Sequence, residues 1–115
     1  MKNSIKLQEL LSQSSDKSQQ VISFSLLCLG IIESLTSGTI SASKAVELFF
    51  HADNCLFVRK TLKRKNADRI MSHGVQLHDI FETLPTEKAQ QEFQRELVVM
   101  HGFCLDLLSG NQIAA

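Results

Sequence analysis

The sequence lacks tryptophan and tyrosine altogether and has only one proline and five glycines among its 115 residues. Residues that break helices are therefore rare, and a mostly helical chain is expected. Hydrophobic residues make up 43% of the chain, which excludes the low hydrophobicity typical of disordered proteins. No segment alternates hydrophobic and polar residues for long enough to predict a β-sheet, and no internal repeat is present.

Net charge is also absent, because twelve basic and twelve acidic side chains cancel. A general attraction to nucleic acid or anionic lipid is therefore not expected, and any electrostatic function must be local. The cysteines Cys28, Cys55 and Cys104 are odd in number and lie far apart in apolar stretches. They favour reduced thiols over a disulfide framework. Residues 1–11 do not resemble a secretory signal, so a cytoplasmic protein is predicted.

Sequence motifs for catalysis or metal binding are missing, since neither CxxC, HExxH nor a phosphate-binding glycine-rich loop occurs. The nearest approaches are the pair His101 and Cys104 and the group His73, His78 and Asp79. Zinc sites usually show close ligand pairs in at least two places, and a nucleophile needs a base and an orienting group. We therefore predict a non-enzymatic protein without catalytic residues, metal ligands or a cofactor.

The longest apolar stretch covers residues 21–35, where Glu33 is the only charged residue. A membrane span needs about 20 apolar residues, so this shorter stretch predicts a buried core helix over about 18–36 and no membrane partner. Its apolar side chains occupy nearly the whole circumference of the helix. Neighbouring helices are therefore expected to cover it on most sides.

Shorter helices are expected before and after this central helix, over residues 4–11, 43–50, 55–65, 67–73 and 76–83. The first belongs to a marginal helix and turn over 1–15, because so short a helix is unstable alone. Whether 55–73 forms one helix or two is left open, and Gly74 is expected to end it. Gly38 is expected to follow the central helix. The expected N-caps are Ser4, Ser15 or Asp16, Ser41 or Ser43, Asp53 or Asn54, and Asn66.

The clearest periodic signal lies in a last helix, predicted over about 86–108 after Pro85. Hydrophobic residues recur there at steps of three and four: Ala89, Phe93, Leu97, Met100, Cys104 and Leu107. Ser109 and Gly110 are expected to end the helix, and residues 111–115 are expected to fray. The predicted fold is all-α, with one domain over 1–115. It is a compact bundle of five to six helices around the central helix, closed by the last one.

The last helix has more hydrophobic residues than one buried stripe requires. The surplus residues are Val98, Val99, Phe103, Leu105 and Leu108. They are candidates for an interface with a partner protein or a second copy of the chain, or else the first helix covers them. Both alternatives stay open. The leading hypothesis is a small intracellular interaction module of the regulator, adaptor or inhibitor type, with a homodimer through this helix as one form.

Six of the twelve basic residues fall between Arg59 and Arg69, where Asp68 is the only acid. On a continuous helix, one face would carry Arg59, Lys60, Lys63 and Arg64. These four residues are candidates for phosphate contacts, although such clusters are most often solvated surface. Only Phe57 is available nearby for stacking on a base. Nucleic-acid binding is therefore the alternative function.

The stretch from Thr39 to Lys65 resembles a helix-turn-helix motif, with Ala45 at the small inner position and a basic second helix. The resemblance implies DNA binding through that second helix. It departs from the motif at the turn, where a small residue, usually glycine, is expected four places after the alanine. This chain has Phe49 there and Phe50 next, so the turn must accommodate two aromatic rings.

Overall fold

A computed structural model describes residues 4–112, and within that range the chain forms helices and connecting turns only. The helices are α1 (Leu7–Leu11), α2 (Lys17–Thr36), α3 (Ala42–Leu48), α4 (Ala52–Phe57), the π-helix η1 (Val58–Leu62), α5 (Lys65–Thr83) and α6 (Thr86–Gln112). The predicted all-α fold is confirmed. Of the tail expected to fray, residues 113–115 lie outside the described residues.

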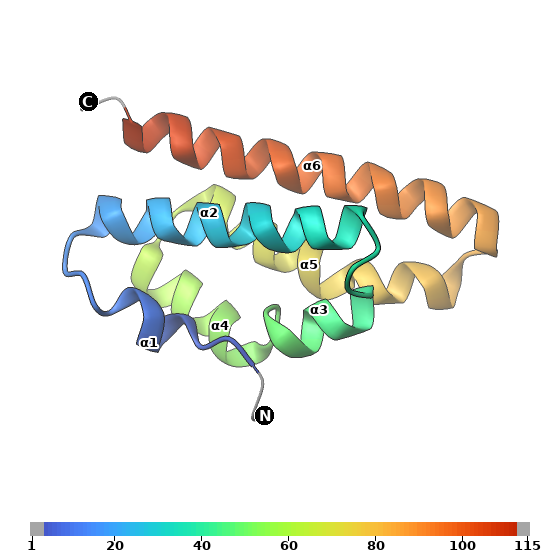
Figure 1. Cartoon of the computed structure of the whole chain (residues 1–115), viewed down its shortest axis with the longest axis horizontal. Coiled ribbons are helices and arrows are strands. Elements are labelled where there is room, and N and C mark those ends of the chain that lie inside the picture. Colours follow the sequence, from blue (N-terminus) through green and yellow to red (C-terminus); the bar gives the residue numbers. More distant parts are fainter. Residues whose placement is uncertain (1–3, 113–115) are drawn as a thin grey trace.

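The helices pack around a core that α6 closes on one side. α2 and α6 run side by side in opposite directions, α5 lies behind them, and α1, α3 and α4 line the side below α2 (Figure 1). α6 packs along both α2 and α5, and these are the two most extensive helix contacts in the fold. The closing role predicted for the last helix is therefore confirmed.

α2 is the central helix that the apolar stretch predicts. Its inner side is buried through Gln20, Val21, Phe24, Ser25, Cys28, Ile31, Ile32 and Leu35. Asp16 caps its first turn by accepting a hydrogen bond from the Ser18 N–H at 3.0 Å. Gly38 follows its end with a φ of +80°, a conformation that glycine adopts without steric cost.

The outer side of α2 is open, because Leu26 is 56% exposed. The composition of α2 predicts that neighbouring helices cover it on most sides. In the structure, only the side that faces the other helices is covered. Among the described residues, α2 is the one helix long and apolar enough to cross a membrane by length and composition. A core helix of a water-soluble protein has the same features, and α2 packs against α6, α1, α3 and η1.

The hydrophobic stripe of α6 is buried as predicted, through Ala89, Phe93, Leu97, Met100, Cys104 and Leu107. The helix begins directly after Pro85, whose carbonyl accepts the Ala89 N–H at 2.8 Å. The predicted end at Ser109 and Gly110 is wrong, since α6 continues to Gln112. A glycine costs a helix only about 1 kcal/mol relative to alanine, which is too little to end a helix this long.

α5 runs unbroken through Gly74, so the predicted end at that residue and the separate helix over 76–83 are wrong. Gly74 is buried and lies against the ring of Phe50. A Cβ atom at Gly74 would be 2.3 Å from Cδ1 of Phe50, far inside normal contact distance. The glycine therefore allows the ring to approach the helix backbone.

The predicted helix over 55–65 is interrupted at two points. α4 widens into η1 at Val58, and Lys63 then adopts a left-handed φ of 54°. Arg64 is the extended residue before α5, so 55–73 contains two helical units divided at Lys63. The end of η1 leaves carbonyl groups without partners inside the helix, and the Lys17 ammonium of α2 donates to one of them, at Thr61.

Two of the predicted N-caps are confirmed, Asp16 for α2 and Ser41 for α3. The Ser41 hydroxyl accepts the Lys44 N–H at 3.0 Å. The other predicted caps are wrong: the N-cap positions of α1, α4 and α5 are Lys6, His51 and Arg64, rather than Ser4, Asp53 or Asn54, and Asn66. None of these three has a capping side-chain hydrogen bond, so tertiary contacts rather than caps fix where these helices begin.

Asn54 joins the amino-terminal segment to the bundle. Its side-chain oxygen accepts the Leu7 N–H at 3.0 Å, and its amide donates to the Ile5 and Phe49 carbonyls at 2.9 and 2.8 Å. The side chain is 2% exposed, so these backbone groups depend on it for their hydrogen bonds. Asn54 therefore docks the marginal first helix onto α4, together with the His51 ring nitrogen, 3.0 Å from the Ile5 carbonyl, and the Ile5 N–H, which donates to the Leu48 carbonyl at 2.8 Å.

Candidate interaction surfaces

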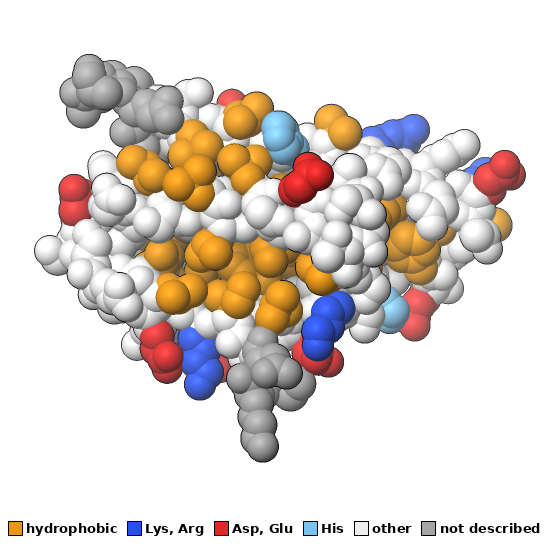
Figure 2. Space-filling view, viewed as in Figure 1, with side chains coloured by type: hydrophobic (Ala, Val, Ile, Leu, Met, Phe, Trp, Pro, Cys, Tyr) orange, Lys and Arg blue, Asp and Glu red, His pale blue; other side chains and the backbone are white. Residues whose placement is uncertain are grey.

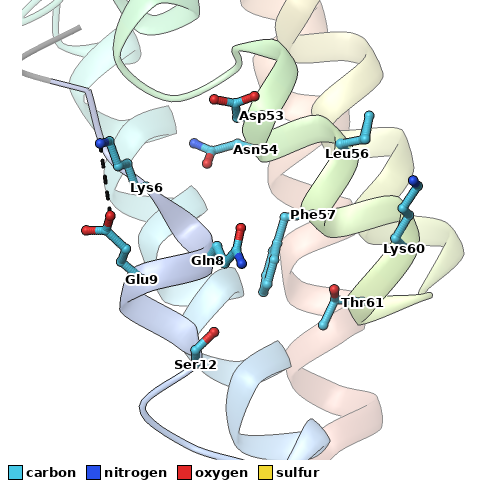
Figure 3. A pocket seen from close by; sticks show the side chains of 10 residues that line it. All are labelled: Lys6, Gln8, Glu9, Ser12, Asp53, Asn54, Leu56, Phe57, Lys60 and Thr61. Carbon is cyan, nitrogen blue, oxygen red and sulfur yellow. Dashed lines mark ion pairs between the residues drawn. The ribbon is translucent and has the colours of Figure 1, made fainter.

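A hollow of about 820 Å³ lies between α1 and the α4–η1 segment (Figure 3). Phe57 lies between Gln8 and Thr61, while Lys6 and Glu9 form an ion pair at 4.0 Å on one side (Figure 3). Its lining contains neither histidine nor cysteine. The hollow is open and of mixed charge, and it therefore gives no reason to propose a reaction there.

The four histidines lie in separate environments. The His51 ring nitrogen lies 3.0 Å from the Ile5 carbonyl. His73 pairs with Glu96, and His78 lies 3.4 Å from Glu82. His101 is exposed on α6, whereas Cys104 is buried, so these two cannot form a ligand pair. Within residues 4–112, no three side chains of His, Cys, Asp or Glu lie together in a group that could hold a metal ion.

Two of the three cysteines meet inside the core, Cys28 from α2 and Cys104 from α6, and all three are free thiols. Burial raises the pKa of the Cys28 thiol well above its usual range, and the adjacent Cys104 raises it further. Burial also raises the pKa of the half-buried Cys55, against a smaller opposing effect of Arg59. Since the thiolate is the reactive form, these environments disfavour nucleophilic chemistry.

The four basic candidates do not share a continuous helical face. Arg59 and Lys60 lie on η1, Lys63 has the left-handed conformation, and Arg64 precedes α5. Lys60 lines the 820 Å³ hollow, whereas Arg59 lies beside Asp68 along another hollow. The backbone break at Lys63 therefore divides the predicted basic face, and nucleic-acid binding stays a prediction.

The stretch that resembles a helix-turn-helix has two buried aromatic rings at its turn. Phe49 and Phe50 are 0% and 1% exposed, and their rings meet edge to face with centroids 5.1 Å apart. The second helix, α4, has six residues before it widens into η1. The turn thus serves the core, where Phe24 also stacks on Phe49 at 6.3 Å.

The five apolar candidates on α6 fall on two sides of the helix, as a turn of 100° per residue requires. Phe103 lies on the side of α5, where its ring centroid is 5.6 Å from that of His73 and 5.9 Å from the Arg69 guanidinium carbon. Val99, four residues earlier, is 38% exposed. The candidates on the side of α2 are Val98, Leu105 and Leu108. The structure therefore covers part of the surplus and leaves part of it outside.

The uncovered part continues onto α2. Residues at steps of three, four and seven place one apolar stripe on each helix, and together these stripes form the surface here named the α2–α6 face: Ile22, Leu26, Leu29, Val98, Leu105 and Leu108. Ile22, Leu29 and Leu108 are half-buried at its inner edge. Val98 is 72% exposed, Leu26 56% and Leu105 47%. Figure 2 shows one group of hydrophobic side chains over the carboxy-terminal half of α6 and a second group below α2. A groove of about 470 Å³ runs between them and is lined by Leu29 and Val98.

Charged side chains are scarce on the α2–α6 face. Glu33 is the only charged residue of α2 after Lys17, and residues 97–105 of α6 contain no Asp, Glu, Lys or Arg. Glu33 and His101 line the same groove, and within residues 4–112 neither side chain has a hydrogen-bond or ion-pair partner. Figure 2 shows the acidic and basic side chains mainly around the margins.

Sequence reasoning found the α6 half of this face and missed the α2 half. The available signal was the recurrence of Leu26, Gly30 and Glu33 on the side opposite the buried residues of α2. Because α2 is apolar nearly all round, its composition hides which side faces water.

No protein-family model, curated protein sequence or solved structure matches this chain.

Proposed function

We propose that this chain is a protein-interaction module that binds its partner through the α2–α6 face. The observation that carries the proposal is the exposure of Val98 and Leu26, at 72% and 56%, on two adjacent helices. Exposed apolar groups that form a contiguous surface with few charges are typical of protein interfaces. A regulator, adaptor or inhibitor that acts by contact needs such a surface and no reaction centre.

The proposal is tested with a matched pair of substitutions. Val98→Glu places a charge on the α2–α6 face, whereas Val75→Glu places the same charge on α5, where Val75 is 42% exposed. The tagged chain and both variants are used for affinity capture from cell lysate, with protein and nucleic acid identified in each eluate. We expect a protein partner that is retained by Val75→Glu and lost with Val98→Glu.

Two outcomes would contradict the proposal. One is a set of captured proteins that Val98→Glu leaves unchanged. The other is captured nucleic acid that survives Val98→Glu and is lost on Lys63→Glu, which would favour the alternative function through the basic residues. Circular dichroism of each variant checks that the helices have formed.

A further inference from the structure

The α2–α6 face is large enough for a stable complex. α2 has 20 residues, so the shared length of the two helices is about 30 Å, and two adjacent helices are about 20 Å wide. The flat footprint is therefore about 600 Å², and the accessible area of a ridged surface exceeds its footprint. Stable complexes bury about 800 Å² of accessible surface per partner, which this ridged face reaches only when its whole length is covered, as it is by a partner surface of the same dimensions.

The ionisable groups on this face complement a second copy of the same face. Glu33 and His101 have no partner within their own chain, as described above, and both line the groove between α2 and α6. A histidine N–H donates to a carboxylate whether or not the ring is charged. A twofold axis would therefore create two equal Glu33–His101 contacts between copies. The whole chain has no net charge, so the copies do not repel each other at long range.

The register of α2 and α6 fixes the position of the twofold axis. The groove is lined on α2 by residues from Leu29 to Thr36 and on α6 by residues from Gln94 to His101. Because the helices are antiparallel, residue 29 lies level with 101 and residue 36 with 94. Continuing this register places Leu26 level with residues 104 and 105. A twofold axis parallel to the helices then lays α2 of one copy on α6 of the other, with Leu26 on Leu105 and Glu33 within reach of His101.

Two glycines lie where this arrangement brings the backbones together. Gly30 and Gly102 are exposed in the middle of their helices, and a Cβ atom at either would have no neighbour within 4 Å. Packing inside one copy therefore gives no reason for their small size. In the register above, they come within one helical turn of each other across the interface, where small residues allow helices to approach closely.

We infer that the partner on the α2–α6 face is a second copy of this chain, packed about a twofold axis so that each α2 lies on the other copy's α6. The inference rests on the proposed function of this face and names its partner. The two copies form a four-helix layer at the interface, with Leu26 and Val98 covered and Glu33 paired with His101 of the other copy.

The first test is the mass of the full chain by sedimentation equilibrium between about 1 and 100 µM, a range that covers dissociation constants typical of weak and moderate dimers. We expect a monomer–dimer equilibrium. Val98→Glu should raise the dissociation constant by about tenfold or more, because it buries an unpaired charge. The control Val75→Glu should leave it unchanged. A strict monomer at about 100 µM, or equal effects of the two variants, would overturn the inference.

The second test is a charge exchange that depends on the proposed pairing. In a dimer of Glu33→Lys, the new lysine faces His101, and in a dimer of His101→Glu, Glu33 faces the new glutamate. Neither arrangement pairs opposite charges, so each variant alone should dimerise about tenfold more weakly than the wild type. In an equimolar mixture of the two variants, the new lysine faces the new glutamate and the unchanged Glu33 faces the unchanged His101. The mixed dimer should therefore recover to within about threefold of the wild type. A mixture no tighter than either variant alone would refute this arrangement.

These outcomes separate the inference from the proposed function. A monomer that still captures a protein partner in a Val98-dependent manner keeps the proposed function and ends the inference. Binding of the chain to phospholipid vesicles, abolished by Val98→Glu and accompanied by no self-association, would identify the face as a lipid-binding surface and overturn both.

Discussion

The contact between Gly74 and Phe50 allows a stability prediction of definite sign. In Gly74→Ala, the new Cβ atom would lie 2.3, 2.4 and 2.5 Å from Cδ1, Cε1 and Cγ of Phe50. Carbon atoms in contact prefer about 3.5 to 4.0 Å, so the ring must retreat by more than about 1 Å. Phe50 is 1% exposed and packs edge to face on Phe49, so the ring has no free space into which it could move.

The magnitude follows from two opposing effects. Forcing extra atoms into a packed core costs about 1 to 3 kcal/mol, and the involvement of Cγ as well as the ring edge places this site at the upper end. Alanine improves the helix propensity of α5 by about 1 kcal/mol. We therefore expect Gly74→Ala to lower the free energy of unfolding by about 2 kcal/mol.

The assay is urea denaturation followed by far-ultraviolet circular dichroism in dilute protein, since the chain has no tryptophan to report on unfolding. Gly30→Ala is the matched control, because a Cβ at that helical glycine meets no atom within 4 Å. It should stabilise the chain by up to about 1 kcal/mol.

A double-mutant cycle checks the cause. Phe50→Leu removes the ring, so Gly74→Ala should cost at least about 1 kcal/mol less in that background than in the wild type. A Gly74→Ala chain as stable as the wild type, or equal costs in both backgrounds, would refute the account of this contact.

Three further predictions concern other residues. Asn54→Ala should lower the free energy of unfolding by about 2 to 4 kcal/mol, because the Leu7 N–H and the Phe49 carbonyl lose their partner and the Ile5 carbonyl keeps only His51, and should expose residues 4–12 to limited proteolysis. Lys63→Gly should stabilise the chain by about 0.5 to 1 kcal/mol in thermal denaturation, since glycine relieves the left-handed strain. Cys55 should react with a thiol reagent only as pH rises above about 8.5, the ordinary thiol value, and Cys28 only after unfolding. The raised pKa of Cys28 also means that its contribution to stability is full below that pH and is lost as pH rises further.

The parts of the fold that the sequence predicts are those encoded by local periodicity. The stripe from Ala89 to Leu107 and the stretch over 21–35 fix α6 and α2, because buried residues at steps of three and four show which side of a helix meets the core. The N-caps Asp16 and Ser41 are local in the same sense, since each bonds an amide within three residues.

The parts that it does not predict depend on distant contacts. The sequence predicts that Gly74 ends a helix. The structure shows instead that Gly74 lies inside α5 against the ring of Phe50, 24 positions earlier. The sequence predicts Asn54 as a helix cap, yet its hydrogen-bond partners are backbone groups of Ile5 and Leu7 as well as of the nearby Phe49. The α2 half of the candidate face is hidden for a related reason, because only the positions of neighbouring helices show that Leu26 faces outward.

The position of α6 against both α2 and α5 has a consequence for how the chain is made. Those two helices present their apolar sides to an element that the ribosome produces after both of them. Until it has left the exit tunnel, the nascent chain must hold an unfinished core in water, where chaperones bind such surfaces. Stalling synthesis near codon 85 should therefore yield a protease-sensitive nascent chain, and release of the remaining residues should complete folding in one cooperative step.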